Sequence, residues 1–258
     1  MTNVAAQAQS LLALHTDPQL LKVVNVWDAI SARVVSEVEG VTALATASHS
    51  IAAAYGYADG ENIPVELMIE AVGGIVAATD LPVTADLEAG YGNPRETTLR
   101  AIGVGVVGCN LEDQMKPISE AVNAVEAVLN AAQQEGIDFV LNARTDAFLK
   151  AGDKPHDEVL ADAIERGRAY LATGAPVVFV PGKVSEDDIK AFVDAWGPQK
   201  LTLIGAPGSV PLARMEELGV ARVSFGPFSQ SVALMALQDL TADIVAGGGL
   251  PADFRVLN

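Results

Sequence analysis

Residues 82–94 read Pro82-Val-Thr-Ala-Asp86-Leu-Glu88-Ala-Gly90-Tyr-Gly92-Asn93-Pro94, and the fold is decided by this stretch. It passes from a short strand-like run into an acidic, glycine-containing turn, and then into a helical pattern that begins at Pro94. This unit of strand, turn and helix recurs along the chain. Most of the strand-like runs have apolar residues in succession, which is typical of parallel strands covered on both faces.

The runs of strand length are Lys22–Trp27, Val41–Thr46, Pro82–Asp86, Val104–Leu111, Asp138–Asn142, Pro176–Pro181, Lys200–Ile204 and Val220–Phe225. Helical patterns cover Asn62–Thr79, Pro94–Val104, Ser119–Glu135, His156–Thr173, Ser185–Trp196, Ser209–Leu218 and Ser229–Ala246. Strands that alternate with helices over 258 residues have the size of one (β/α)₈ barrel. We therefore predict an α/β fold, a single TIM-type barrel over residues 1–258, with a C-terminal helical segment at about 229–258.

A doubly wound open sheet is the competing architecture. It usually has fewer strands and often a glycine-rich phosphate turn directly after a strand. The nearest sequence is Gly103-Val-Gly105-Val-Val-Gly108, which precedes or overlaps the fourth predicted strand. We interpret these glycines as a turn and a close packing contact, and favour the barrel.

Composition excludes several classes of protein. Half of the residues are hydrophobic and the formal net charge is −17, which argues against nucleic acid and anionic membrane surfaces as partners. The longest stretch without Asp, Glu, Lys or Arg, Gly40–Ala58, is too polar for a membrane span. There is no evident signal peptide, and Cys109 is the single cysteine, so we expect a cytoplasmic protein.

Ionisable residues gather where the predicted strands end, and active sites of barrels lie at the C-terminal strand ends. These strand ends read Trp27-Asp28, Ser48-His49-Ser50, Asp86-Leu-Glu88, Asn110-Leu-Glu112-Asp113, Asn142-Ala-Arg144-Thr-Asp146 and Pro181-Gly-Lys183. We expect one functional rim built from these segments.

Asp86, Glu88 and Glu112 are the most informative residues of this rim. Three carboxylates around one small opening repel each other and raise each other's pKa unless a cation joins them. Oxygen-only ligands suit a hard cation, most simply Mg²⁺, which keeps several of its waters. The alternative is that the three acids are solvated loop residues.

Arg144 directly follows the fifth strand, where its guanidinium would hold a carboxylate or phosphonate in a fork. An internal salt bridge to Asp146 or Glu112 is the alternative, and both roles can coexist. His49 is either a general base or a hydrogen-bonded structural residue. Cys109 is expected to be a buried, inert thiol. The contexts of His15 and His156 predict surface positions.

Four motifs together resemble the isocitrate lyase/phosphoenolpyruvate mutase superfamily, in order, over roughly residues 20 to 240. They are Asn25-Val-Trp27-Asp28-Ala-Ile-Ser31-Ala32, Asp86-Leu-Glu88-Ala-Gly-Tyr-Gly92-Asn93, Gly108-Cys-Asn-Leu-Glu112-Asp113-Gln114 and Ala143-Arg144-Thr-Asp146-Ala147. The combination is specific, although no single motif is.

The resemblance implies an (α/β)₈ barrel that binds Mg²⁺ and stabilises a pyruvate-like enolate. It implies that Asp86 ligates Mg²⁺, with Glu88 and Glu112 acting directly or through water. The implied substrate-binding residues are Trp27, Asp28, Ser48, His49 and Arg144, with backbone amides near Ser48 and His49 on the substrate oxygens. The implied catalytic residues are Arg144, Asp59 and His49. Family members often assemble as tetramers by exchanging the last helix, and Ser229–Ala246 would serve for that.

Two departures from the family pattern bear on the reaction. The (methyl)isocitrate lyases carry a Lys-Lys/Arg-Cys-Gly-His motif after the fourth strand, whereas this chain reads Glu112-Asp-Gln-Met-Lys-Pro117 and has no later cysteine. Glu88 stands where the phosphonate enzymes commonly have aspartate. These departures argue against (methyl)isocitrate lyase activity.

The sequence therefore predicts a Mg²⁺-dependent lyase acting on a small 2-oxo or 2-hydroxy dicarboxylic acid, similar to oxaloacetate, through a pyruvate enolate. Phosphonopyruvate-type P–C cleavage is the second hypothesis. The third is a barrel that only binds a metabolite. The expected partners are a small carboxylic acid and further copies of the chain in a dimer or tetramer.

Overall fold

A computed structural model of the chain describes residues 2–257. Its strands form one parallel sheet in the order β1-β9-β8-β7-β6-β5-β4-β3-β2. The strands are β1 (Leu21–Val23), β2 (Asn25–Val26), β3 (Leu44–Thr46), β4 (Val83–Asp86), β5 (Gly108–Glu112), β6 (Val140–Arg144), β7 (Val177–Val180), β8 (Leu201–Ile204) and β9 (Arg222–Ser224).

The sheet closes on itself through the first strand. β1 and β2 are separated only by Val24; β1 pairs with β9, whereas β2 pairs with β3. Asn25 fastens this closure, because its Oδ1 accepts bonds from the amides of Phe225 and Gly226 at 2.7 Å and its Nδ2 donates to the Thr46 carbonyl at 2.8 Å. The predicted α/β barrel is confirmed, and the open doubly wound sheet is excluded.

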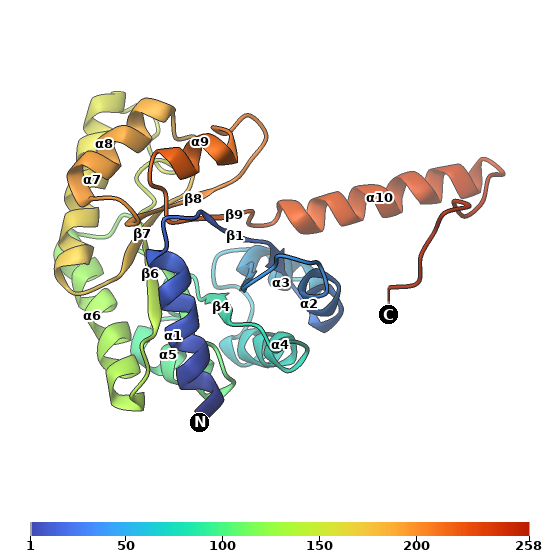
Figure 1. The fold of residues 1–258 in the computed structure, drawn as a ribbon, viewed down its shortest axis with the longest axis horizontal. Helices are drawn as coiled ribbons and strands as arrows, with labels where there is room; N and C mark the ends of the chain where they lie inside the picture. The colour runs from blue at the N-terminus through green and yellow to red at the C-terminus, as the bar shows by residue number, and fades with distance from the viewer. Residues whose placement is uncertain (1, 258) are drawn as a thin grey trace.

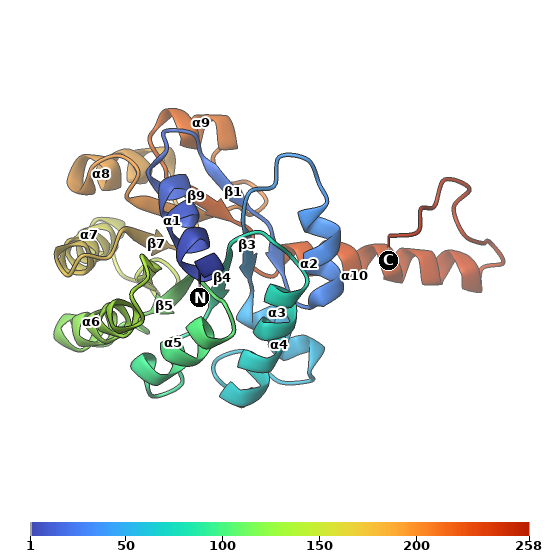
Figure 2. The same ribbon diagram turned by 60° about the horizontal axis from the view of Figure 1, so that its bottom comes forward.

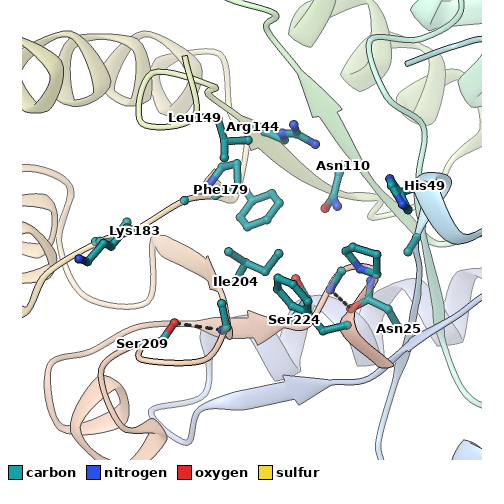
Figure 3. Close-up of a pocket in the computed structure, with 18 of the residues that line it drawn as sticks. Asn25, His49, Asn110, Arg144, Leu149, Phe179, Lys183, Ile204, Ser209 and Ser224 are labelled. Carbon is teal, nitrogen blue, oxygen red and sulfur yellow. Dashed lines mark hydrogen bonds between the residues drawn. The ribbon is translucent and has the colours of Figure 1, made fainter. Parts of the chain in front are cut away.

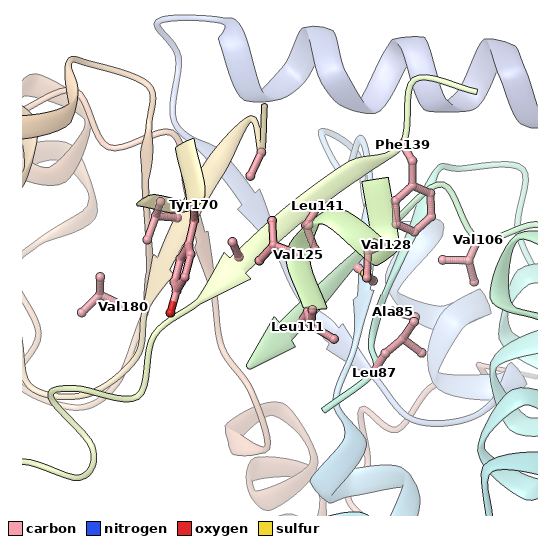
Figure 4. Close-up of a cluster of buried hydrophobic side chains, with 14 of the residues drawn as sticks. Ala85, Leu87, Val106, Leu111, Val125, Val128, Phe139, Leu141, Tyr170 and Val180 are labelled. Carbon is pink, nitrogen blue, oxygen red and sulfur yellow. The ribbon is translucent and has the colours of Figure 1, made fainter. Parts of the chain in front are cut away.

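Most of the helices surround the barrel, whereas α10 projects away from it (Figures 1 and 2). Their bounds are α1 (Thr2–Thr16), α2 (Ala29–Ser36), α3 (Ser48–Ala54), α4 (Val65–Ala77), α5 (Pro94–Gly103), α6 (Ile118–Glu135), α7 (His156–Ala172), α8 (Glu186–Trp196), α9 (Leu212–Glu217) and α10 (Phe228–Val245). The main core lies between strands and helices, where Leu111 and Leu141 of the sheet meet Val125 and Val128 of α6 (Figure 4). The successive apolar residues of each strand are explained by this burial on both faces.

α1 covers the end of the barrel where the strands begin. Ala8 and Leu11 pack against a second cluster formed by Leu21, Val23, Ala43, Ala45, Val107, Val140, Val177 and Ala221. His15 is fully buried there, and its Nδ1 lies 2.8 Å from the Leu11 carbonyl oxygen. The surface position predicted for His15 is therefore wrong, because α1 turns inward onto the barrel. With this end closed, the opposite mouth is free for a site.

Every helix predicted from the sequence is present, with ends shifted by a few residues, whereas α1, α2 and α3 were not predicted. The Gly103–Gly108 stretch is a turn followed by a close contact, as predicted: a Cβ on Gly108 would lie 2.7 Å from the Val140 carbonyl oxygen. No helix within residues 2–257 is long and apolar enough to cross a membrane. The C-terminal helical segment ends at Val245, and residues 246–257 are not helical.

Candidate functional site

A cavity of about 1070 Å³ opens at the C-terminal ends of the strands, opposite α1. Figure 3 shows side chains from several strands and loops around it. Among the predicted site residues, the lining includes Ser48, His49, Asp59, Asp86 and Arg144. The structure does not bring Glu88 and Glu112 into the lining of this cavity, and Glu112 lines a second, smaller pocket together with Asp113 and Arg144.

Asp86 ends β4 and is held by the start of α3. The backbone amide and the hydroxyl of Ser48 both donate to Asp86 Oδ2, at 3.3 and 2.8 Å. The other oxygen, Oδ1, is buried and has no hydrogen-bond partner among residues 2–257. A buried carboxylate oxygen without a donor is costly, so Asp86 has one position suited to a cation.

Glu88 lies in the turn that follows β4 and has a left-handed backbone, with φ 51°. Its carboxylate accepts bonds from the Tyr91 hydroxyl at 2.9 Å and from the Glu61 amide. Gly90 makes the turn possible, because its φ is 92° and a Cβ there would lie 2.7 Å from Pro94. Burial, together with the charges of Asp86 and Asp59, raises the pKa of Glu88 to about 7.

Glu112 and Arg144 occupy paired positions on β5 and β6. Arg144 Nη1 lies 2.9 Å from Glu112 Oε2, and Arg144 Nε lies 2.8 Å from Asp146 Oδ1, so the predicted internal ion pairs exist. Burial raises the pKa of Glu112 to about 7, and nearby carboxylates add to this against the opposing effect of Arg144. Neither ion pair uses Arg144 Nη2, and Arg144 lines the cavity. An internal ion pair and a substrate contact are therefore compatible.

The donor set at this rim consists of oxygens. The three carboxylates come from the ends of the neighbouring strands β4 and β5, where the Glu112 amide donates to the Glu88 carbonyl at 2.8 Å. Within residues 2–257, no three His, Cys, Asp or Glu side chains stand together as a ready-made ligand set, because Glu88 and Glu112 are turned toward protein partners. The unpartnered oxygen of Asp86 among other carboxylates fits a hard cation that keeps several waters, as Mg²⁺ does.

His49 and Asp59 form a half-exposed pair at the edge of the cavity, with His49 Nδ1 and Asp59 Oδ2 3.4 Å apart. Trp27 and Asp28 do not line the cavity. Asp28 caps α2: its carboxylate accepts a bond from the Ser31 amide at 2.7 Å, and the Ser31 hydroxyl accepts one from the Asp28 amide at 3.1 Å. The substrate-binding role of Trp27 and Asp28 stays a prediction.

The connection from β5 to α6 is short and tightly held. Asp113 accepts hydrogen bonds from the amides of Met115 and Asp146, and its other oxygen lies 2.7 Å from the Tyr170 hydroxyl and 3.1 Å from Arg166 Nη1. Cys109 is fully buried in β5, and burial raises the pKa of its thiol, so it is inert as predicted. The segment after Glu112 therefore brings no thiol to the site.

Sequence reasoning missed several lining residues. Asn25 and Ser224 are polar residues inside apolar strands, and that pattern could have marked them as facing the barrel interior. Phe179 and Ile204 also line the cavity, but no sequence signal separates them from ordinary core residues.

A family model described as Phosphoenolpyruvate phosphomutase matches residues 11–245. The chain belongs to this family. Among curated relatives, it is 28% identical to 2,3-dimethylmalate lyase of Eubacterium barkeri over 92% of this chain and 85% of the relative. It is 30% identical to probable 2-methylisocitrate lyase 2 of Corynebacterium glutamicum over 70% of this chain, and it spans only 62% of that relative's length.

Solved structures of the phosphoenolpyruvate phosphomutase family share the fold. A "putative phosphonomutase" from Burkholderia cenocepacia J2315 has a TM-score of 0.85 and 41% identity, covering 95% of this chain and 100% of that one. Oxaloacetate acetylhydrolase in complex with the product oxalate has a TM-score of 0.85 and 25% identity, covering 96% and 91%. The resemblance to the isocitrate lyase/phosphoenolpyruvate mutase superfamily is confirmed, and homologues in it are lyases, mutases or hydrolases of small carboxylic acids.

Proposed function

We propose that the chain is a Mg²⁺-dependent lyase that cleaves a carbon–carbon bond of a small 2-oxo or 2-hydroxy dicarboxylic acid of the oxaloacetate type. The observation that carries the proposal is the unpartnered buried oxygen of Asp86 among carboxylates at the strand ends, beside Arg144 in the cavity. Similarity to 2,3-dimethylmalate lyase and to oxaloacetate acetylhydrolase supports the substrate class.

In this proposal the carboxylates of Asp86, Glu88 and Glu112 hold Mg²⁺, directly or through water. With a 2-oxo acid of the oxaloacetate type, the C3–C4 bond breaks, C4 leaves as CO₂, and the electron pair left at C3 becomes negative charge on the C2 oxygen of a pyruvate enolate. With a 2-hydroxy acid, the C2–C3 bond breaks instead: the C2 hydroxyl gives its proton to a base and becomes the 2-oxo group of one product, and the electron pair stays at C3 as the enolate of the other acid. Bound Mg²⁺ would supply the positive charge that offsets this developing charge. The protein's own cation, Arg144, is oriented by Glu112 and Asp146 and has Nη2 available for a substrate carboxylate.

The enolate must then take up a proton at carbon. We assign this transfer to His49, which lies at the cavity edge with Asp59 beside its ring. The Ser48 amide and hydroxyl donate hydrogen bonds to Asp86 and so fix the position of its carboxylate in the cavity. Because the segment after β5 brings no cysteine to the site, we favour substrates whose leaving group needs no thiol as acid.

A second candidate is hydrolysis of the P–C bond of a phosphonopyruvate-type acid, which similarity to a "putative phosphonomutase" favours. Purified protein incubated with Mg²⁺ and a panel of 2-oxo and 2-hydroxy acids, followed by proton and phosphorus NMR, separates the candidates. Pyruvate from a dicarboxylic acid supports the lyase, and phosphate from phosphonopyruvate supports the second candidate. Mg²⁺-dependent ligand binding without turnover would leave a metabolite-binding barrel and overturn both.

We further propose that the chain acts in the cytoplasm and assembles through α10, as the single cysteine and the apolar last helix suggest. Both points are separate from the choice of reaction.

A further inference from the structure

The ring of strand ends divides into a charged and an apolar half. In the sheet, Glu112 of β5 pairs with Arg144 of β6, and Arg144 pairs with Phe179 of β7. The residue next to the charged pair is therefore a phenylalanine. Ile204 follows at the end of β8, and both Phe179 and Ile204 line the cavity. Figure 3 shows their side chains projecting into the middle of the cavity.

The loops above β7 and β8 continue this apolar wall. Val184 and Val210 line the cavity there, and Leu149 and Phe228 add apolar surface at its mouth, with exposed fractions of 52% and 39%. Exposed apolar side chains that border a cavity mark a binding surface more often than isolated ones do.

The charged groups of this half, Lys183, His156 and Asp188, lie on the loop after β7 and in the first turns of α7 and α8, and not at the ends of β7 and β8. Asp188 is buried, and its carboxylate is occupied by the Ser185 amide and hydroxyl and by His156 Nε2, which lies 2.7 Å from it. Lys183 is exposed and lies at the edge of the cavity (Figure 3). The strand-end side chains Phe179 and Ile204 themselves offer no hydrogen-bond donor or charge, so a substrate group that lies against them is favoured when it is apolar.

We infer that the wall of Phe179, Ile204, Val184 and Val210 is a subsite for an apolar substituent of the substrate, longer than a methyl group. This inference rests on the proposed function, because the acid end of the substrate must lie at Asp86 and Arg144. It specifies 2-oxo or 2-hydroxy acids that carry an alkyl or aryl group. The cavity, at about 1070 Å³, is far larger than pyruvate requires.

Binding of stable 2-oxo acids tests the subsite. Full-length protein saturated with Mg²⁺ is titrated calorimetrically with pyruvate, 2-oxobutanoate, 2-oxopentanoate and 2-oxohexanoate. Affinity should rise about threefold per added methylene, as expected when each methylene is buried.

Variants locate the effect. Ile204→Asn should reduce the ratio of the 2-oxohexanoate and pyruvate affinities by about tenfold, whereas Ile204→Val, which stays apolar, should keep most of it. Val210→Asn is a second polar variant on a loop, for the case that Ile204→Asn does not fold.

The outcomes separate the two proposals. If pyruvate binds with Mg²⁺ but affinity does not change with chain length, or if Ile204→Asn and Val210→Asn keep the dependence on chain length, the apolar subsite is overturned and the proposed function stands. If no 2-oxo acid binds, the proposed function fails, and the subsite fails with it.

Discussion

Asp86 is the last residue of β4 and Asp113 directly follows β5, the neighbouring strand, yet the two carboxylates differ in their hydrogen-bond partners. Asp113 is surrounded by donors, including Arg166 and Tyr170, whereas Asp86 keeps one buried oxygen without a partner. We expect Asp86→Asn to abolish Mg²⁺ binding in calorimetry while leaving the circular dichroism spectrum unchanged, because the amide keeps the shape and removes the charge.

The matched control for Asp86→Asn is Asp113→Asn. It should lower the free energy of unfolding by about 3 kcal/mol in urea titrations, because Arg166 loses its buried partner, yet Mg²⁺ binding at Asp86 should persist. Retained Mg²⁺ affinity in Asp86→Asn would refute the metal assignment.

Arg144 is oriented by Glu112 and Asp146, and its planar guanidinium presents donors that an ammonium cannot reproduce. Arg144→Lys should therefore weaken binding of oxalate, a stable mimic of the enolate, by at least tenfold in calorimetry. Lys150→Arg is the control: Lys150 also pairs with Asp146 but is half-exposed, so exchanging its cation should not matter. Equal oxalate affinity in Arg144→Lys and wild type would remove Arg144 from the substrate site.

Glu88 and Glu112 make the metal-free protein sensitive to pH. Burial raises the pKa of each to about 7 in the folded state, above the ordinary value of 4.5. Between these values the folded state binds more protons than the unfolded state, so this contribution to stability is complete below pH 4.5 and is lost as the pH rises through about 7.

At high pH, bound Mg²⁺ should restore the stability that is lost when Glu88 and Glu112 lose their protons. Differential scanning calorimetry should show a larger Mg²⁺-induced rise in Tm at pH 8 than at pH 5.5, because protons compete with the cation for the carboxylates. The double variant Glu88→Gln, Glu112→Gln should lose most of this difference. A pH-independent effect of Mg²⁺ would place the cation elsewhere.

At the scale of elements, substitutions of Asp28 can show whether this residue stabilises α2 or binds the substrate. Its carboxylate and the Ser31 hydroxyl form a reciprocal cap at the start of α2. Asp28→Ala should reduce the free energy of unfolding by about 1 kcal/mol, whereas Asp28→Ser, which can still cap, should remain near wild type. A change in oxalate affinity in both variants, without loss of stability in Asp28→Ser, would instead show that the carboxylate contacts substrate.

The elements that could be predicted from the sequence are those with a strong period or a long apolar run. The strands around Ala85 and Leu141 are buried on both faces, so their composition alone marked them. α2 and α3 have 8 and 7 residues, too short for a clear helical period, and such helices depend on tertiary packing for their stability. α1 was missed, and His15 with it, because its burial follows from contacts with strands distant in sequence.

Some features of the candidate site could also be predicted from the sequence, and others could not. Convergence of Asp86, Glu112 and Arg144 followed from the rule that parallel strand ends meet at one edge of the barrel. The turning of Glu88 toward Tyr91 and the Glu61 amide depends on positive backbone φ angles at Glu61, Glu88 and Tyr91, which no spacing rule predicts. The apolar half of the rim could not be predicted from the sequence either, because Phe179 lies in a buried apolar strand and cannot be told apart from a core residue.

At the scale of the whole molecule, α10 differs from the other helices because most of its apolar side chains are exposed. It projects away from the barrel (Figure 1), and of its residues only Gln230 is buried, donating to the Ser50 carbonyl at 3.0 Å. Val232, Leu234, Met235 and Leu237 are 57–67% exposed. In a chain whose net charge is −17, this exposed apolar helix supports our proposal that another copy of the chain covers it.

Sedimentation equilibrium should therefore show a dimer or tetramer, and the double variant Leu234→Glu, Leu237→Glu should sediment as a monomer. Gln133→Glu with Gln134→Glu adds the same charge on α6 and should leave the assembly intact, which separates loss of the apolar face from simple charge repulsion. The variant barrel should keep its fold, since α10 lends almost nothing to its own core. A wild-type monomer at micromolar concentration, or an oligomer that survives the α10 substitutions, would show that this helix is not the interface.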